Sequence, residues 1–301
     1  DLVRSRGLGD VYKRQEAGLD PEKPPATFDD VVKYSKALTL KDSSGKVTRP
    51  GITIAIYGWF FEQFMAAQDG LYADNGNGRE KPATQVVFNN DNGKAILDWW
   101  QGMVKEGIAG NIGRKTADTQ KAFIGGQTAM MIDSTAVLKD VVSGVGGKFD
   151  VGVGYLPRPA GARGGVIPGG GSLWILKGHA PAEQKAAWEF VKWMSAAKQQ
   201  ATWHTKTGYF PITKAAYNDA DLQAYDKQYP QFTVAVKQLR DTPITPATRG
   251  ALLGVFTQAR QTVEGAIEAV LAAKATSKEA LDKAAADISA AVKQYNATVG
   301  K

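Results

Sequence analysis

The sequence predicts a mixed α/β fold with a substantial hydrophobic core. The chain has 301 residues, of which 43% are hydrophobic, and this is enough for one large domain or two ordinary ones. Segments with the period of an amphipathic helix alternate with short apolar runs that have the length of strands. No internal repeat or long low-complexity linker interrupts the alternation. Helices and strands are therefore expected to pack together.

Several segments predict helices with recognisable ends. In residues 24–38, Thr27 can cap a helix and Asp30 stands at the acidic position of a capping box. Residues 89–107 carry buried aromatics and close on a glycine, and residues 277–299 form a long amphipathic pattern. Four further helical regions are expected. One follows the strand predicted at 52–56 and ends at Gly70, one lies at the start of 119–133, one covers 181–196, and several helices follow residues 203–217.

Four short runs predict strands. Ile52 to Ile56 is β-branched, and the end of 119–133 is an apolar run after a glycine turn. Residues 149–157 and 169–178 have similar strand-like patterns. Between helices, residues 203–217 ("WHTKTGYFPITKAAY") set two aromatics on an elbow stiffened by glycine and proline. A tyrosine in such an elbow is either a packing wedge or the wall of a binding site.

Composition excludes several classes of function. The chain has no cysteine and only 2 histidines, so disulfides and thiol chemistry are excluded and no metal site or cofactor is expected. His179 and His204 are expected to be surface residues. The net charge of +7 is spread along the chain, without the basic blocks and interleaved aromatics of nucleic-acid binding. No apolar run reaches the length of a membrane span. The composition does not exclude the binding of a small anionic ligand.

The N-terminal residues 1–15 differ from the rest. "DVYKRQ" can be written in codons as GAT-GTG-TAT-AAG-AGA-CAG, which resembles the transposase end sequence used to build sequencing libraries. We therefore expect an artefactual leader that packs poorly, with the biological chain starting near Glu16; a genuine basic leader is the alternative. Residues 1–15 carry four basic and two acidic residues, so without them the net charge of +7 becomes +5.

Ordinary catalytic signatures are missing, which argues against an enzyme. The chain has no G-x-S-x-G elbow and no H-E-x-x-H motif. The glycine run at 169–171 precedes a predicted strand, whereas a phosphate-binding loop follows a strand and opens a helix. A nucleophilic triad would need a histidine near Ser134 or Ser172.

Three blocks carry a resemblance to a known family. "GRKTADTQKAFIGGQTAMMIDST", "GGGSLWILKG" and "WHTKTGYFPITKAAY" resemble, in order and spacing, those of the extracellular solute-binding proteins of ABC importers, in the class that includes maltose-binding protein. The resemblance runs from about Ala17 to the C-terminus and is greatest to members that bind glycerol 3-phosphate. It implies the α/β, two-lobed periplasmic-binding-protein fold (type II, maltose-binding-like), missing most of the N-terminal lobe.

The same resemblance implies an arrangement and a setting. Residues 16–165 and 215–301 should form the C-terminal lobe, and residues 166–214 should be a remnant of the N-terminal lobe. The protein should be a monomer, periplasmic or lipid-anchored at the cell surface, that takes a small-molecule ligand and delivers it to a membrane permease. Glycerol 3-phosphate or a glycerophosphodiester is the implied ligand, and a sugar or oligosaccharide is the alternative.

Three of the five site residues implied by the resemblance offer polar contacts. Ser134 should open a helix, where its hydroxyl and free N–H groups suit a phosphate or polyol oxygen, unless it is only an N-cap. Gly170 should bring its backbone to the ligand, or else form a tight hinge. Arg260 should bind the phosphate with its guanidinium fork, or else be a surface arginine.

The other two are aromatic. Tyr209 should point from the elbow toward the cleft, with Phe210 and Pro211 as the packed part; pure packing is the alternative. Trp59 should lie against the carbon face of a polyol or sugar, or belong to the core. One residue departs from a phosphate site: Asp133 would repel an anion unless it points away or pairs with a base, and an acid there suits sugar hydroxyls.

Overall fold

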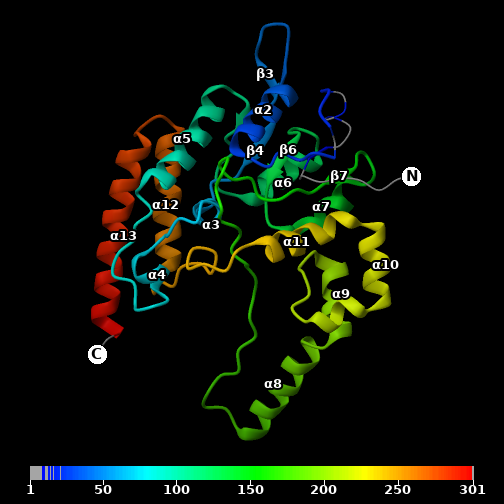
Figure 1. Ribbon diagram of the computed structural model, residues 1–301, viewed down its shortest axis with the longest axis vertical. Coiled ribbons are helices and arrows are strands. Elements are labelled where there is room, and N and C mark those ends of the chain that lie inside the picture. The colour runs from blue at the N-terminus through cyan, green and yellow to red at the C-terminus, as the bar shows by residue number, and fades with distance from the viewer. Residues whose placement is uncertain (1–8, 11–12, 14, 16, 21, 300–301) are drawn as a thin grey trace.

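The computed structural model describes residues 9–10, 13, 15, 17–20 and 22–299 of the chain (Figure 1). Its central element is a five-stranded sheet in the order β5-β4-β6-β1-β7. β4 runs parallel to both β5 and β6, whereas β1 is antiparallel to β6 and β7. The strands are β1 Gly9–Asp10, β4 Ile52–Ile54, β5 Ala109–Gly110, β6 Met130–Ile132 and β7 Val151–Gly152.

Helices cover both faces of this sheet. Side chains alternate along a strand, so Met130 and Ile132 belong to one hydrophobic cluster and Met131 to the other. The first cluster includes residues of α2 Phe28–Leu38, α3 Gly58–Ala67, α5 Asp91–Lys105, α12 Phe256–Leu271 and α13 Ser277–Val299, and the last three helices lie at the left of Figure 1. The second is formed with α6 Thr116–Ile124, α7 Leu138–Val145, η3 Pro230–Thr233 and α11 Val234–Asp241.

The predicted helix ends are set by local chemistry. Thr27 and Asp30 form the expected capping box of α2, with Asp30 N–H donating to Thr27 Oγ1 at 3.1 Å and Thr27 N–H donating to the Asp30 carboxylate at 3.0 Å. Burial of the α5 residue Trp100 and the α13 residue Ile288 confirms the two amphipathic patterns that predicted these helices.

The remaining elements connect these layers. A small hairpin, β2 Leu40–Lys41 with β3 Val47–Arg49, projects at the top of Figure 1, and α4 Asp74–Gly78 is a turn with left-handed residues inside it. The other helices are η1 Thr135–Val137, α8 Pro181–Met194, α9 Ala197–Thr207, η2 Lys214–Asn218 and α10 Ala220–Gln228. Within the described ranges, none of the helices is long and apolar enough to span a membrane.

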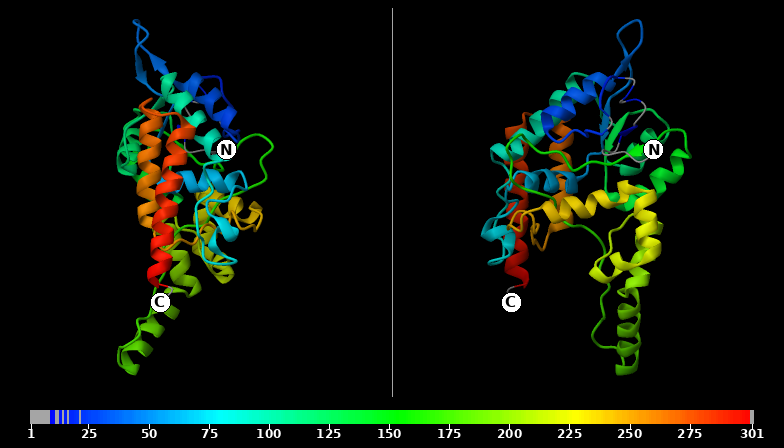
Figure 2. Two further views of the ribbon diagram at one scale, coloured as in Figure 1. Left: turned by 90° about the vertical axis from the view of Figure 1, so that its left-hand side faces the viewer. Right: turned by 45° about the vertical axis from the view of Figure 1, so that its right-hand side comes forward.

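The strand predicted at 169–178 is wrong. These residues form no strand, and α8 after them buries none of its side chains. Figure 2 shows α8 extending away from the sheet. A strand requires a partner for its backbone groups, and no described segment pairs with this one. The apolar side chains that predicted burial are therefore exposed: Leu173, Trp174, Leu176, Trp188, Phe190 and Trp193.

The expectation that residues 1–15 pack poorly is wrong for Gly9, Asp10 and Lys13. β1 pairs with β6 and β7, and Lys13 Nζ lies 5.2 Å from the centroid of the Phe149 ring. The backbone groups between β6 and β7 accept any extended segment within reach, because sheet pairing needs no particular side chain. The rest of the predicted leader lies outside the described residues, and its origin as a library sequence stays a prediction.

Candidate functional site

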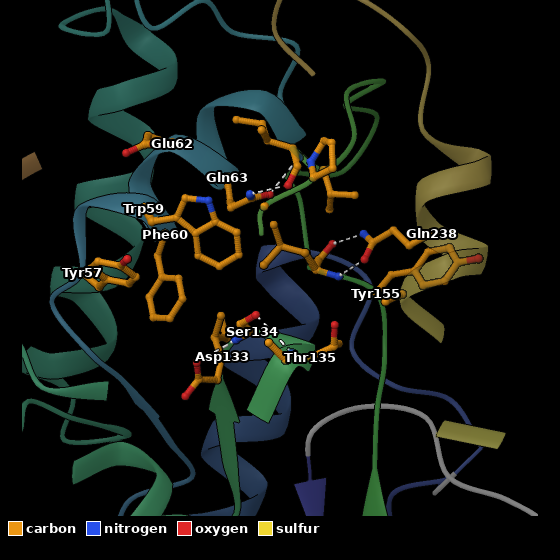
Figure 3. A pocket seen from close by; sticks show the side chains of 18 of the residues that line it. Tyr57, Trp59, Phe60, Glu62, Gln63, Asp133, Ser134, Thr135, Tyr155 and Gln238 are labelled. Atoms are coloured by element: carbon orange, nitrogen blue, oxygen red, sulfur yellow. Dashed lines mark hydrogen bonds between the residues drawn. The ribbon is translucent and has the colours of Figure 1, made fainter. Parts of the chain in front are cut away.

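A cavity of ≈ 830 Å³ opens beside the end of β6 (Figure 3). Its walls come from segments far apart in the sequence: the start of α3, the residues after β6, the start of α12 and the elbow before η2. Two extended segments, 153–157 and 166–170, also line it. The wall is largely apolar and carries a smaller number of polar and aromatic side chains, which is the composition expected of a site for a small ligand.

All five residues implied by the sequence line this one cavity. They come from α3, the turn after β6, the 166–170 segment, the elbow and α12, and in the chain they are separated by tens of residues. The structure thus brings the set together, while the contact of each with a ligand stays a prediction. The five are Trp59, Ser134, Gly170, Tyr209 and Arg260.

Ser134 caps the short helix that follows β6. Its Oγ accepts a hydrogen bond from Ala136 N–H at 3.2 Å, so the predicted helix start is confirmed. Asp133 lines the same part of the cavity. Its carboxylate accepts hydrogen bonds from two neutral donors, Gln120 Nε2 at 2.8 Å and Ser134 N–H at 2.7 Å. It pairs with no base among the described residues. Burial raises the pKa of the Asp133 carboxyl, although both hydrogen bonds oppose the shift.

Arg260 is part of an ion pair in the cavity wall. Its Nε lies 2.6 Å and its Nη2 2.9 Å from the two carboxylate oxygens of Glu62, and the guanidinium lies 4.8 Å from the centroid of the Phe256 ring. Glu62 is 6% exposed. Burial raises the pKa of this carboxyl, while the hydrogen bonds and charge of Arg260 act in the opposite direction. The Nε edge of the Arg260 fork is therefore already engaged, and only its other edge can reach a ligand.

The elbow at 208–211 presents Tyr209 to the cavity. Pro211 is buried, whereas Tyr209 is 39% exposed and its phenol hydroxyl forms no hydrogen bond within the described part of the chain. The expectation of a surface His204 is wrong. His204 is 1% exposed, its Nδ1 donates to the carbonyl of Tyr209 at 2.7 Å, and its Nε2 lies 3.2 Å from the carboxylate of Asp226.

That error has a structural cause. His204 ends a helix whose sequence is polar, but α10 folds back over this end and encloses it. The buried imidazole links the elbow to α10, so it fixes the backbone from which Tyr209 projects. His179, by contrast, is exposed as predicted, and its nearest acid is Glu183 at 3.5 Å.

Two glutamines hold the extended segments that cross the cavity. Gln63 Nε2 donates to the carbonyl of Ile167 at 2.8 Å, and Ile167 N–H donates back to Gln63 Oε1 at 3.0 Å. Gln238 binds both backbone groups of Leu156 in the same way, at 3.0 and 3.4 Å (Figure 3). Gly170, with φ of 147°, follows the segment held by Gln63.

Trp59 is half-buried and lies in the cavity wall, rather than in the core. A Cβ atom at Gly169 would lie 3.4 Å from Cζ2 of the indole, so the tryptophan packs under the glycine run. Figure 3 shows the ring on α3 above Ser134 and Asp133. One face of a ligand can therefore rest on an aromatic surface.

Sequence reasoning missed several residues of the site. Gln63 and Gln238 gave no local signal because a glutamine at a helix surface is ordinary until a backbone segment crosses it. Glu62 sits in a mostly apolar helix, and an acid at such a position was a signal available in the sequence. Arg79 and Arg249 also line the cavity, next to a loop that the sequence left unassigned.

Comparisons with known proteins agree on one family. Residues 11–231 match the family model described as bacterial extracellular solute-binding protein. The sn-glycerol-3-phosphate-binding periplasmic protein UgpB of Pectobacterium atrosepticum is 34% identical over 279 residues, which cover 91% of this chain. The chain spans 61% of the length of that relative.

Two solved structures have a fold similar to that of this chain. The sugar-binding protein MalE of Xanthomonas citri superposes with a TM-score of 0.74 at 17% identity, over 97% of this chain and 69% of that one. UgpB of Mycobacterium tuberculosis in complex with glycerophosphocholine superposes with a TM-score of 0.73 at 19% identity, over 96% and 68%. They confirm the predicted α/β fold class of maltose-binding-like proteins.

Proposed function

We propose, from the premise that this chain belongs to the family of bacterial extracellular solute-binding proteins, that it captures glycerol 3-phosphate or a glycerophosphodiester. It acts as the substrate-binding component of an ABC importer, in the periplasm or anchored at the cell surface, and delivers its ligand to a membrane permease. It works as a monomer and performs no catalysis. One observation carries the proposal: five residues chosen from the sequence alone line one cavity.

The chemistry of the wall suits a phosphorylated polyol. Three arginines line the cavity and can hold a phosphate through charge-assisted hydrogen bonds. Ser134 and Asp133 lie together at the end of β6, where a hydroxyl and a carboxylate can bind polyol hydroxyl groups. Trp59 offers an apolar face to the carbon chain. A ligand with one anionic end and one hydroxylated end uses all of these groups.

A sugar or oligosaccharide is the second candidate. Asp133 favours it, since this residue lines the cavity and is paired with no base in the described ranges. A carboxylate can accept hydrogen bonds from sugar hydroxyls without the repulsion that a phosphate would meet. The aromatic wall suits a sugar ring equally well. The two candidates differ in one testable respect, because only the first needs an anionic group in the ligand.

Ligand titration followed by tryptophan fluorescence tests the proposal. Glycerol 3-phosphate, glycerophosphocholine, glycerol and maltose are added separately to the protein, and saturable binding of the two phosphorylated compounds is expected. Tyr209→Phe removes one hydroxyl from the cavity and should weaken that binding. Tyr295→Phe is the matched control, because Tyr295 is also 39% exposed but lies away from the cavity.

Saturable binding of maltose with none of glycerol 3-phosphate would replace the proposal by the sugar alternative. Equal affinity of the Tyr209→Phe variant and the parent for every ligand would remove the elbow from the site. Turnover of any of these compounds would contradict a transport role.

A further inference from the structure

Two neighbouring arginines, Arg79 and Arg249, line the cavity at its edge. Arg79 Nε donates to the carbonyl of Gly250 at 2.7 Å, and its Nη2 donates to the carbonyl of Arg249. The pKa of Arg79 is lowered, first by partial burial and then by the positive charge of Arg249. Arg79 is thus bound to the backbone of the residue that carries the Arg249 side chain, and both positive charges lie at the same edge of the cavity.

The loop that carries Arg249 is fixed at both ends. Asn77, which is 1% exposed, donates from Nδ2 to the carbonyl of Pro246 at 3.0 Å and accepts from Leu252 N–H at 2.8 Å through its backbone carbonyl. Thr248 is buried, and its Oγ1 accepts from Thr245 N–H at 2.9 Å. The exposed Arg249 side chain thus projects from a backbone that is already fixed, so binding a ligand requires the side chain to be ordered but not the loop.

The charge of this arginine pair is not balanced by the protein. No carboxylate lies within ion-pair distance of Arg79 or Arg249 in the part of the chain that the structure describes. Arg260, in contrast, binds Glu62 through two of its nitrogens. An anion bound at this edge would supply the counter-charge that the described part of the chain does not.

We propose that Arg249, braced beside Arg79, forms a phosphate-binding subsite of this cavity that is separate from the Arg260–Glu62 pair. This deepens the proposed function and rests on it for the polyol half of the ligand. The phosphate lies at the Arg249 edge, and the hydroxyl groups lie toward Asp133 and Ser134. The subsite recognises a phosphate group as such, whether it is esterified in the ligand or free in solution.

The test compares Arg249→Gln with the parent for three compounds: glycerol 3-phosphate, inorganic phosphate and glycerol. Arg163→Gln is the matched control, because Arg163 is exposed and does not line the cavity. Affinities are measured by tryptophan fluorescence, and a thermal unfolding curve checks that each variant is folded. Arg249→Gln should weaken binding of both phosphate compounds about tenfold, because one charge-assisted contact is lost. Glycerol binding, and every affinity of the control, should stay unchanged.

The outcomes separate the subsite from the proposed function. If the parent binds glycerol 3-phosphate and Arg249→Gln binds it equally well, the subsite is wrong and the proposed function stands. If inorganic phosphate depends on Arg249 but the glycerol moiety adds no affinity, the subsite stands and the proposed ligand is wrong. If the folded parent binds neither phosphate compound, both are wrong.

Discussion

Removing Arg260 should destabilise the fold even without ligand. Glu62 is 6% exposed, so Arg260→Ala leaves a buried carboxylate that has lost its partner. Breaking a fully buried pair in this way costs about 3 to 5 kcal/mol. Because the Arg260 side chain is 34% exposed and water can partly replace it, we expect a loss of about 2 to 3 kcal/mol in the free energy of unfolding.

A double-mutant cycle measured by urea unfolding, followed by tryptophan fluorescence, is the assay. Arg260→Ala leaves the buried charge of Glu62 without a partner, and Glu62→Gln removes that charge. The double variant should therefore recover most of the lost free energy of unfolding. The deficit of Arg260→Ala should also depend on pH. Without Arg260, the raised pKa of Glu62 rises further, and the folded state then binds this proton more tightly than the unfolded state.

The sign of that dependence follows from the direction of the shift. The deficit should be small near the ordinary carboxyl pKa of 4.5 and should grow as the pH rises above it. Stability of Arg260→Ala within about 0.5 kcal/mol of the parent at neutral pH, which is the range of ordinary surface substitutions, would refute the reasoning. So would strictly additive losses in the double variant, because the two side chains would then not be coupled.

Three further variants probe the elbow and the cavity wall, and a fourth, Gly147→Ala, is a control. His204→Ala should lower the free energy of unfolding by about 2 kcal/mol and weaken ligand binding, since it frees the backbone of Tyr209; unaltered urea midpoints would contradict this. Gly208→Ala should cost about 3 kcal/mol, because φ is 108° and the new Cβ would lie 2.3 Å from a carbonyl oxygen. Gly147→Ala is the control, because Gly147 has φ of 77° but an added Cβ would meet no atom; it should cost about 1 kcal/mol. Equal losses of the two variants in urea unfolding would show that the clash at Gly208 does not matter. Burial raises the pKa of Asp133, so the destabilising contribution of this carboxyl should grow as the pH rises above about 4. The free energy of unfolding of Asp133→Asn should therefore increase relative to that of the parent over this range, and parallel pH profiles of unfolding would refute it.

The sequence was most informative where structure depends on neighbours along the chain. The capping box of Thr27 and Asp30 and the buried faces of α5 and α13 were predictable because helix bonds and caps join residues three or four positions apart. The run at 169–178 was not predictable in this way, because a strand forms only where another segment supplies its hydrogen bonds. The same pattern that predicts a buried strand is here an exposed, irregular segment.

The candidate site shows the same difference between what the sequence predicts and what the tertiary structure decides. The resemblance to a known family implied five residues of the wall, which are Trp59, Ser134, Gly170, Tyr209 and Arg260. The tertiary structure alone decided that Arg260 is bound to Glu62, that His204 is buried under α10, and that two glutamines hold the crossing segments. Partners in these contacts are separated by up to 198 residues, and which of them meet is set by the packing of the whole core.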